Sequence, residues 1–112
     1  MSLKRISQFF NPSSVAVIGA SNTPTRAGNV VMRNLLQGGF KGPIMPVTPN
    51  HTAVHGVLAY SSIEALPKVP DLAVICTNKN TLMKIIEQLG TLGCQSAIII
   101  ADGLTGTQKQ EL

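Results

Sequence analysis

Hydrophobic residues follow two patterns along this chain. Val15–Ile18 and Leu72–Ile75 are continuous apolar runs of four residues, which is typical of parallel strands buried on both faces. Residues 29–37 and 81–92 instead place apolar side chains every three or four positions, which predicts amphipathic helices. Strands and helices therefore alternate along the sequence.

Such alternation predicts a mostly parallel sheet with right-handed crossovers, that is, a Rossmann-like α/β fold. Asn80 is the expected N-cap of the second long helix, and Gly93 the residue just past its end. Weaker patterns predict further elements: a helix at 3–10, a strand at 44–47 that Pro46 keeps short, a third strand within 54–60, a helical turn at 62–66, a strand at 96–100 and a helix starting at Thr105.

The length bounds the domain organisation. A chain of 112 residues with 44% hydrophobic content can bury one core. No apolar run approaches the roughly 20 residues that span a bilayer, and the start does not resemble a signal peptide. We therefore expect a single cytoplasmic domain with no membrane partner. Because the helical pattern from Thr105 has only begun when the chain stops, we expect residues 1–112 to be the N-terminal domain of a longer, multidomain protein.

The net charge of +4 is unevenly distributed. No acidic residue occurs before Glu64, whereas five basic residues do. With four aromatic residues in all and no cluster of basic ones, a nucleic-acid surface is disfavoured. The charge distribution favours a small polyanionic ligand near the N-terminal half.

The sequence around the first predicted strand is the main candidate for such a site. A strand, a glycine turn at Gly19 and a helix follow one another, and this arrangement directs backbone N–H groups and a helix N-terminus at one point. Ser21 and Asn22 supply polar side chains, and Arg26 supplies a positive charge near the first turn of the helix. The spacing from Gly19 to Gly28 is not the Gly-x-Gly-x-x-Gly fingerprint, so a purely architectural glycine turn remains an alternative.

Ligands of parallel sheets bind beyond the carboxyl ends of the strands. Four predicted loops converge there: 19–28, 47–51, 76–80 and 101–103. A dinucleotide site for NAD would place an acidic residue near the end of the second strand, but residues 47–51 contain none. NAD is therefore disfavoured relative to a ligand with an additional phosphate on its ribose.

No catalytic or metal-binding set is evident. Cys76 and Cys94 are too far apart for a metal-binding pair and adjoin apolar runs, so we expect buried free thiols. His51 and His55 are four residues apart, but no third ligand is near. We expect no metal and no catalytic residue in this chain.

Longer motifs carry a resemblance to a known family. They are Val15–Ser21 with Gly28, Arg33–Leu36, Gly38–Gly42, Pro46–Pro49, and Leu66–Pro67 with Pro70–Ile75. With these, the sequence resembles the coenzyme-A-binding domain of the nucleoside-diphosphate-forming acyl-CoA synthetases, the group that includes the succinyl-CoA synthetase α subunit. More closely, residues 22–28, 42–49 and 71–78 resemble the N-terminal domain of the bacterial protein lysine acetyltransferases of the Pat type.

The resemblance implies a ligand, CoA or acetyl-CoA, and a layout for it. The pyrophosphate would rest on residues 21–28 with Arg26 as counter-charge, the adenosine ribose and its 3′-phosphate would lie near Asn50 and His51, and the pantetheine arm would cross 76–78 and 101–103. The expected cofactor-binding residues are Gly19, Ala20, Ser21, Asn22, Arg26, Gly28, Val47, Thr48, Pro49, Asn50, His51, Cys76, Thr77, Asn78, Ala101 and Asp102.

The resemblance also implies what the chain does alone. It would bind CoA without catalysis, and an acetyltransferase acting on protein lysines would need the remaining domains. Three alternatives stay open: an ADP-forming acetyl-CoA synthetase, whose phosphorylated histidine would lie in a later domain; an NAD(P)-binding regulatory domain; and an interaction module without a ligand.

Overall fold

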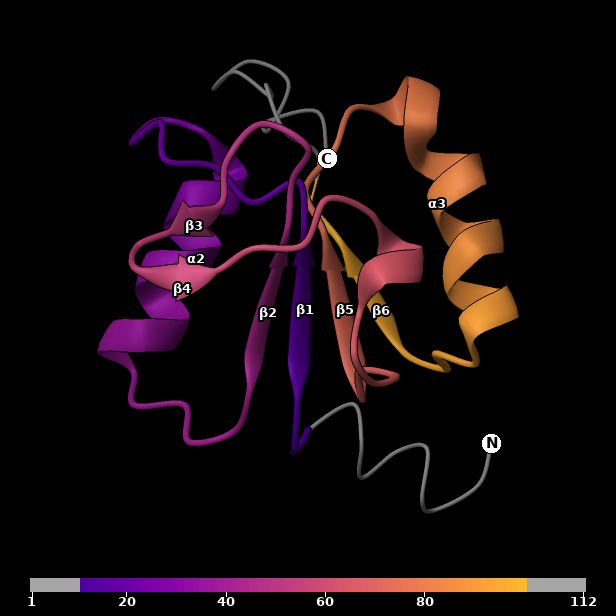
Figure 1. Ribbon diagram of the computed structural model, residues 1–112, viewed down its shortest axis with the longest axis horizontal. Coiled ribbons are helices and arrows are strands. Elements are labelled where there is room, and N and C mark those ends of the chain that lie inside the picture. Colours follow the sequence, from indigo (N-terminus) through magenta and orange to yellow (C-terminus); the bar gives the residue numbers. More distant parts are fainter. Residues whose placement is uncertain (1–10, 101–112) are drawn as a thin grey trace, which may run out of the picture.

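The computed structural model describes residues 11–100, which form a four-stranded parallel sheet between two helices (Figure 1). The elements are β1 (Val15–Ile18), α2 (Ala27–Gln37), β2 (Ile44–Val47), β3 (Ala53–Val54), β4 (Val57–Leu58), η1 (Ile63–Ala65), β5 (Leu72–Ile75), α3 (Lys79–Leu92) and β6 (Ala97–Ile99). The helices predicted at 3–10 and from Thr105 fall outside the described residues. The predicted Rossmann-like α/β architecture is confirmed.

The strand order of the sheet is β2-β1-β5-β6, and every pair is parallel. β1 is central, with Val15 beside Ile44 of β2 and Leu72 of β5. The chain moves to β2 on one side of β1 and later returns to β5 on the other. This reversal of strand order next to β1 is the topological switch point at which α/β sheets bind ligands.

Alternate residues of the strands face two separate cores. On one face, Val15 and Val17 pack with Met32 of α2, which is fully buried. On the other face, Ala16 and Ile18 belong to the cluster of Ile85 and Leu89 of α3. The two helices therefore cover opposite faces of the sheet, as Figure 1 shows.

Helix α2 begins two residues earlier than its apolar spacing predicts and ends where expected. Gly38 is its C-cap, and Gly39 follows with a φ of +75°. Not every apolar side chain of α2 is buried: Leu36 is 40% exposed, whereas Val31 and Leu35 pack against the core. The apolar stripe of α2 is therefore narrower than the sequence indicates.

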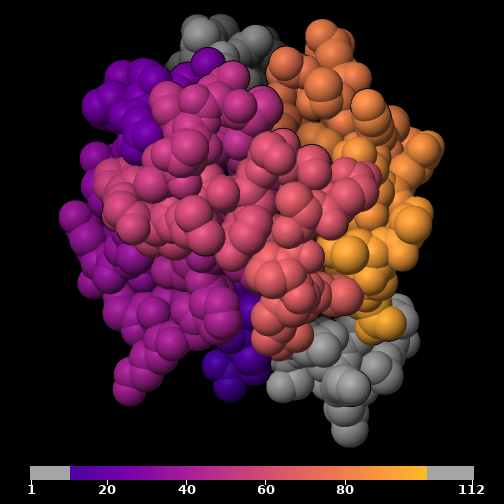
Figure 2. Space-filling model, in the orientation of Figure 1, coloured from indigo at the N-terminus to yellow at the C-terminus, as the bar shows by residue number. Residues whose placement is uncertain are grey.

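The third strand predicted within 54–60 is instead an antiparallel hairpin, β3–β4, outside the main sheet. Its two-residue turn, His55 and Gly56, has φ values of +51° and +79°, the left-handed conformation that short hairpins favour. Val54 anchors the hairpin because it is fully buried beside α2. In Figure 2 the segment after β2 spreads over the face between the α2 and α3 segments.

Past the hairpin, the backbone of Tyr60 pairs with the edge of β2. Its N–H donates to the carbonyl of Pro46 (2.9 Å), and its carbonyl accepts from the N–H of Thr48 (2.9 Å). The chain then forms the helical turn η1, as predicted, before it crosses to β5. This pairing covers the free edge of β2 and holds the loop that leaves it.

Helix α3 begins at Lys79, two residues before the predicted start. Its N-cap is Asn78, not Asn80, because the Asn78 side chain accepts a hydrogen bond from the Asn80 amide (3.0 Å). Gly93 ends the helix with a φ of +103°, as predicted. The cap position is thus the second residue after Cys76, directly beyond β5.

Both cysteines are free. Cys76 is buried, as predicted, whereas Cys94 is only half-buried, and desolvation raises the pKa of its thiol. Neither helix in the described segment has the length and apolar character needed to cross a bilayer.

Candidate functional site

A cavity of about 440 Å³ lies where the sequence predicts the ligand site, beyond the carboxyl ends of β1, β2 and β5. Three of the four loops expected to converge there contribute to its wall. The lining residues are Gly19, Ala20, Ser21, Thr23, Arg26, Thr48, Pro49, Asn50, His51, Cys76, Thr77, Asn78 and Thr81. Ala101 and Asp102, from the fourth loop, are outside the described residues.

Two glycines allow the loop after β1 to fold tightly against its neighbours. Gly19 has a φ of +89°, and a Cβ there would lie 2.8 Å from the carbonyl oxygen of Cys76. A Cβ on Gly28 would overlap the carbonyl oxygen of Gly19. Gly28 is buried and does not line the cavity, so its role is to bring the first turn of α2 against the end of β1.

The sequence predicts that the loop after β1 directs backbone N–H groups at the ligand. For four of these N–H groups the prediction is wrong, because they already donate hydrogen bonds within the protein. The amides of Gly19 and Ala20 donate to the carbonyl of Val47, at 3.0 and 3.3 Å. The amide of Thr23 donates to Ser21 Oγ (2.9 Å), and that of Arg26 to the carbonyl of Thr23. These bonds fold the loop before any ligand arrives.

Some hydrogen-bonding capacity remains at the cavity. Within residues 11–100, the backbone amide of Ser21, which lines the cavity, has no hydrogen-bond partner. Arg26 occupies the N-cap position of α2 without capping it through its side chain, and no acidic residue stands in the first turn. The positive end of the α2 dipole is therefore not offset by a carboxylate in that turn.

The loop after β2 contributes polar groups without a carboxylate. Thr48 is buried, and its Oγ1 accepts a hydrogen bond from the Asn50 amide (3.3 Å). Pro49, Asn50 and His51 are exposed and line the cavity. Val47, also predicted as a site residue, is buried and only supplies the carbonyl that holds the first loop.

The loop after β5 brings a second helix N-terminus to the cavity. The Asn78 side chain caps α3, and Thr81 Oγ1 donates to the Asn78 carbonyl (3.2 Å). Thr81 was not predicted as a site residue. The sequence feature that could have indicated Thr81 is its position in the first turn of a helix that follows a site loop. Side chains in such a turn lie close to the carboxyl ends of the strands, where ligands bind.

The hydroxyl of Thr77 lacks a hydrogen-bond partner in the described part of the chain. Its oxygen, Oγ1, is enclosed by neighbouring atoms. An unpaired buried hydroxyl lowers stability by about 1 to 3 kcal/mol. Such a group beside a cavity is one that a ligand could pair with after rotation about χ1.

Asn22, predicted to contact the ligand, does not line the cavity. Its side chain instead bridges to the hairpin: Nδ2 donates to the carbonyl of Ala53 (3.0 Å), and Oδ1 accepts from the amide of His55 (3.3 Å). Asn22 therefore connects the first loop to β3–β4.

The charges around the cavity favour an anion. Among the described lining residues, Arg26 is the cation, and none carries a carboxylate. The N-termini of α2 and α3 both open toward it, and each adds partial positive charge. No group of three His, Cys, Asp or Glu residues in 11–100 could hold a metal ion.

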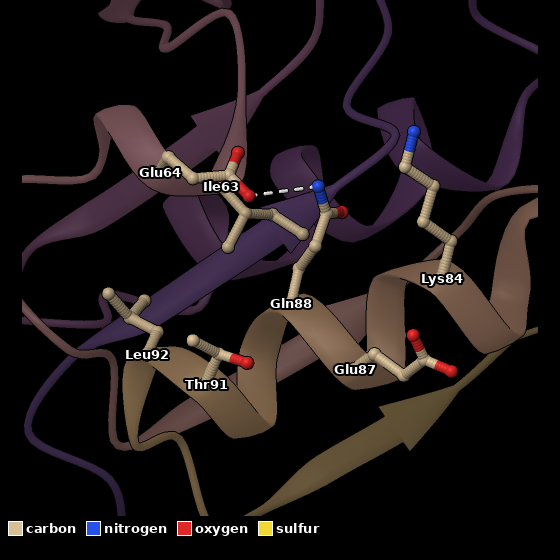
Figure 3. A pocket seen from close by; sticks show the side chains of 7 residues that line it. All are labelled: Ile63, Glu64, Lys84, Glu87, Gln88, Thr91 and Leu92. Carbon is tan, nitrogen blue, oxygen red and sulfur yellow. Dashed lines mark hydrogen bonds between the residues drawn. The ribbon is translucent and has the colours of Figure 1, made fainter.

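A second hollow of about 460 Å³ lies between η1 and α3. Figure 3 shows its lining residues, among them Glu64, whose Oε2 accepts a hydrogen bond from Gln88 Nε2 (2.9 Å). Lys84 and Glu87 add charges of both signs. Because it lies away from the carboxyl ends of the strands and contains carboxylates, it does not suit a phosphate-bearing ligand.

Comparison with known proteins decides the family. Residues 13–112 match the model of the family described as the CoA binding domain. This chain belongs to that family. The resemblance to the CoA-binding domain of the synthetases is thereby confirmed. The matched residues include all three described loops that line the cavity.

Three curated relatives of this CoA binding domain are named as CoA ligases. It is 38% identical over 104 residues to the α subunit of acetate–CoA ligase [ADP-forming] II from Pyrococcus furiosus, covering 91% of this chain and 22% of that protein. It is 36% identical over 101 residues to acetate–CoA ligase [ADP-forming] from Methanocaldococcus jannaschii, covering 90% of this chain and 14% of that protein. It is 35% identical over 104 residues to 4-hydroxybutyrate–CoA ligase [ADP-forming] from Nitrosopumilus maritimus, covering 93% of this chain and 15% of that protein.

Solved structures agree with the fold of this CoA binding domain. The dinucleotide forming acetyl-coenzyme A synthetase 1 of Ca. Korarchaeum cryptofilum, in complex with phosphate and ADP, superimposes with a TM-score of 0.82 at 32% identity, covering 96% of this chain and 24% of that one. Its apo form gives a TM-score of 0.83 at 33% identity, covering 95% and 23%.

These comparisons separate the coarser resemblance from the finer one. They support the synthetase group and give no support to the closer resemblance to protein lysine acetyltransferases, nor to a bacterial source, because the relatives are mostly archaeal. The chain spans only 14 to 22% of the length of the three relatives named.

Proposed function

We propose that this CoA binding domain holds CoA or an acyl-CoA in the cavity at the ends of β1, β2 and β5, as part of an ADP-forming acyl-CoA synthetase. The observation that supports this most is the lining of that cavity: two helix N-termini and Arg26 face it, and no carboxylate does among the described residues. The pyrophosphate and the 3′-phosphate of CoA would be stabilised by this charge pattern.

The parts of the ligand would follow the three loops. The pyrophosphate would lie on Ser21 and the start of α2 beside Arg26, where the backbone amide of Ser21 remains. The adenosine ribose and its 3′-phosphate would lie near Asn50 and His51. The pantetheine arm would run along residues 76–78, where the enclosed Thr77 hydroxyl could gain a partner. Ala101 and Asp102, which lie outside the described residues, are also proposed to contact the pantetheine arm.

The synthetase is a better proposal than the acetyltransferase. The relatives named above form an acyl-CoA with release of ADP, according to their names, whereas transfer to a protein lysine has no such support. In either case this chain would bind and orient the coenzyme, and other domains would carry out the chemistry. Two assays of the complete gene product distinguish the activities. ATP-dependent consumption of CoA in the presence of a carboxylic acid detects the synthetase, and ATP-independent release of CoA from acetyl-CoA on addition of a lysine-bearing protein detects the acetyltransferase.

An NAD(P) site fits the structure less well. A hydroxyl-binding carboxylate is expected at the end of the second strand of such a site, but the lining residues there are Thr48, Pro49, Asn50 and His51. A neutral to weakly basic end suits the 3′-phosphate of CoA.

Calorimetric titration of the 112-residue chain with CoA, dephospho-CoA and NAD tests the proposal. We expect CoA to bind, and dephospho-CoA to bind about ten-fold or more weakly because it lacks one phosphate and its charge-assisted hydrogen bonds. NAD should not bind measurably. Binding of NAD without a response to CoA would overturn the proposal.

A further inference from the structure

The loop that carries Ser21 and Thr23 is held from three directions. Thr23 N–H donates to Ser21 Oγ within the loop (2.9 Å), and Asn29 Nδ2, which belongs to a buried residue of α2, donates to the Ser21 carbonyl (3.1 Å). Asn22 supplies the third hold through its two bonds to the β3–β4 hairpin. Its neighbours on both sides line the cavity, whereas Asn22 itself does not.

The hairpin is a firm support for this contact. Val54 is fully buried in the α2 core, and Val54 pairs with Val57 across the hairpin. Ala59 N–H donates to the Thr52 carbonyl (2.9 Å), which closes the base of the hairpin. The two groups that Asn22 contacts, on Ala53 and His55, flank Val54. The side-chain amide of Asn22 thus joins a solvent-exposed loop to a hairpin backbone that core packing holds in place.

From this arrangement we propose that Asn22 is a positioning residue for the coenzyme: it holds the 21–23 loop in its binding conformation through the β3–β4 hairpin without touching the ligand. The inference rests on the proposed function. Ordering a loop at the moment of binding subtracts from affinity, so a loop ordered beforehand binds more tightly. The hairpin, which sequence reasoning reads as an ordinary strand, is then part of the binding machinery.

Two substitutions should act on the same contact from opposite sides. Asn22→Ala removes both bonds and leaves the lining side chains in place. Gly56→Ala alters the other partner, because Gly56 has a φ of +79° that a side chain strains while its added Cβ meets no atom within 4 Å. Asn34→Ala is the matched control, since Asn34 is exposed on α2 and does not line the cavity.

Calorimetric titration of the wild type, the three single variants and the Asn22→Ala, Gly56→Ala double variant with CoA tests the inference, together with hydrogen exchange at the His55 amide. We expect Asn22→Ala and Gly56→Ala each to weaken CoA binding about three- to ten-fold, and Asn34→Ala to leave it unchanged. The double variant should be no weaker than about the worse single one, because both changes release the same loop. The His55 amide should exchange faster in Asn22→Ala.

The outcomes separate the inference from the proposed function. If the wild-type chain does not bind CoA, the proposed function fails and the inference falls with it. If the wild type binds and Asn22→Ala, still folded by its thermal unfolding curve, binds equally well, only the inference fails. Should Asn22→Ala not fold, unchanged affinity in Gly56→Ala contradicts the inference in its place, and so would losses in the two variants that simply add.

Discussion

Gly19 and Gly28 meet at the turn after β1, and neither position has room for a side chain. A Cβ at Gly19 would press on the carbonyl oxygen of Cys76, and one at Gly28 on the carbonyl oxygen of Gly19. The sequence indicated the turn at Gly19 but assigned Gly28 to ligand contact. The structure shows that Gly28 lets α2 approach the sheet, a requirement that spacing alone does not reveal.

Gly28→Ala should lower the free energy of unfolding by about 2 to 3 kcal/mol, because its Cβ would overlap the Gly19 carbonyl oxygen. Gly90→Ala is the matched control: Gly90 lies inside α3, and a Cβ there meets nothing within 4 Å. The control should gain about 0.5 to 1 kcal/mol from helix propensity. Equilibrium urea unfolding measures both, and equal stability of the Gly28 variant and the wild type contradicts the prediction.

Arg26→Ala should weaken CoA binding about ten-fold or more, since the guanidinium is the cation that lines the described part of the cavity. The loss should shrink as salt rises, because screening reduces what the charge contributes. Arg33→Ala, on α2 away from the lining, should bind CoA as the wild type does. Titration at two salt concentrations checks this, and an unchanged affinity for Arg26→Ala would remove Arg26 from the site.

Thr77→Val should raise the free energy of unfolding by about 1 kcal/mol, because it replaces an unpaired enclosed hydroxyl by a methyl group. The same change should weaken CoA binding about three-fold or more if the hydroxyl turns to the ligand. Thr48→Val should instead destabilise by about 0.5 to 1 kcal/mol, as Thr48 Oγ1 accepts a hydrogen bond. A destabilised Thr77→Val with full affinity contradicts the role given to this residue.

At the scale of elements, the long patterns predicted well and the short ones did not. The runs at β1 and β5 are read directly from apolar spacing, because packing on the sheet fixes them. Helix α3 follows from its spacing too, with Ile85 and Leu89 buried, although Ile86 of the same stripe is 39% exposed. β3 and β4 have two residues each, too few for any periodicity. Their hairpin depends on the His55–Gly56 turn and on Val54 entering the α2 core, which only the folded chain brings together.

The start of α3 shows a related limit. Asn78 and Asn80 are both good N-cap residues, and the choice between them depends on where β5 ends. The structure assigns the cap to Asn78, whose side chain accepts from the Asn80 amide. Thr81, the first residue of the predicted helix, is the third residue of α3 and lines the cavity, a place that the predicted site did not include.

Asn78→Ala should therefore lower the free energy of unfolding by about 1 kcal/mol through loss of the cap. Asn80→Ala should change it by less than about 0.5 kcal/mol, because its backbone amide is kept and alanine favours the helix. Thermal unfolding followed by circular dichroism compares the two variants. A larger loss for Asn80→Ala would indicate that the sequence-based cap was correct after all.

At the scale of the whole molecule, the fold brings three loops, distant in sequence, to one end of a parallel sheet. Strand order explains why: with β2 and β5 on either side of β1, all three strands end beside the same cavity. The hollow between η1 and α3 is of similar volume but carries carboxylates and lies off that end. Charge and topology, and not volume, select between the two.

The most direct measurement of the central claim is a map of CoA binding on the folded chain by backbone amide NMR. The amide resonances of residues 19–26 and 48–51, apart from Pro24 and Pro49, which have no N–H, and those of residues 76–81 should shift together and saturate at one affinity. The amide resonances of Glu64, Lys84 and Gln88 in the second hollow should not shift. Shifts centred on the η1–α3 hollow, or none in the three loops at saturating CoA, would contradict the account.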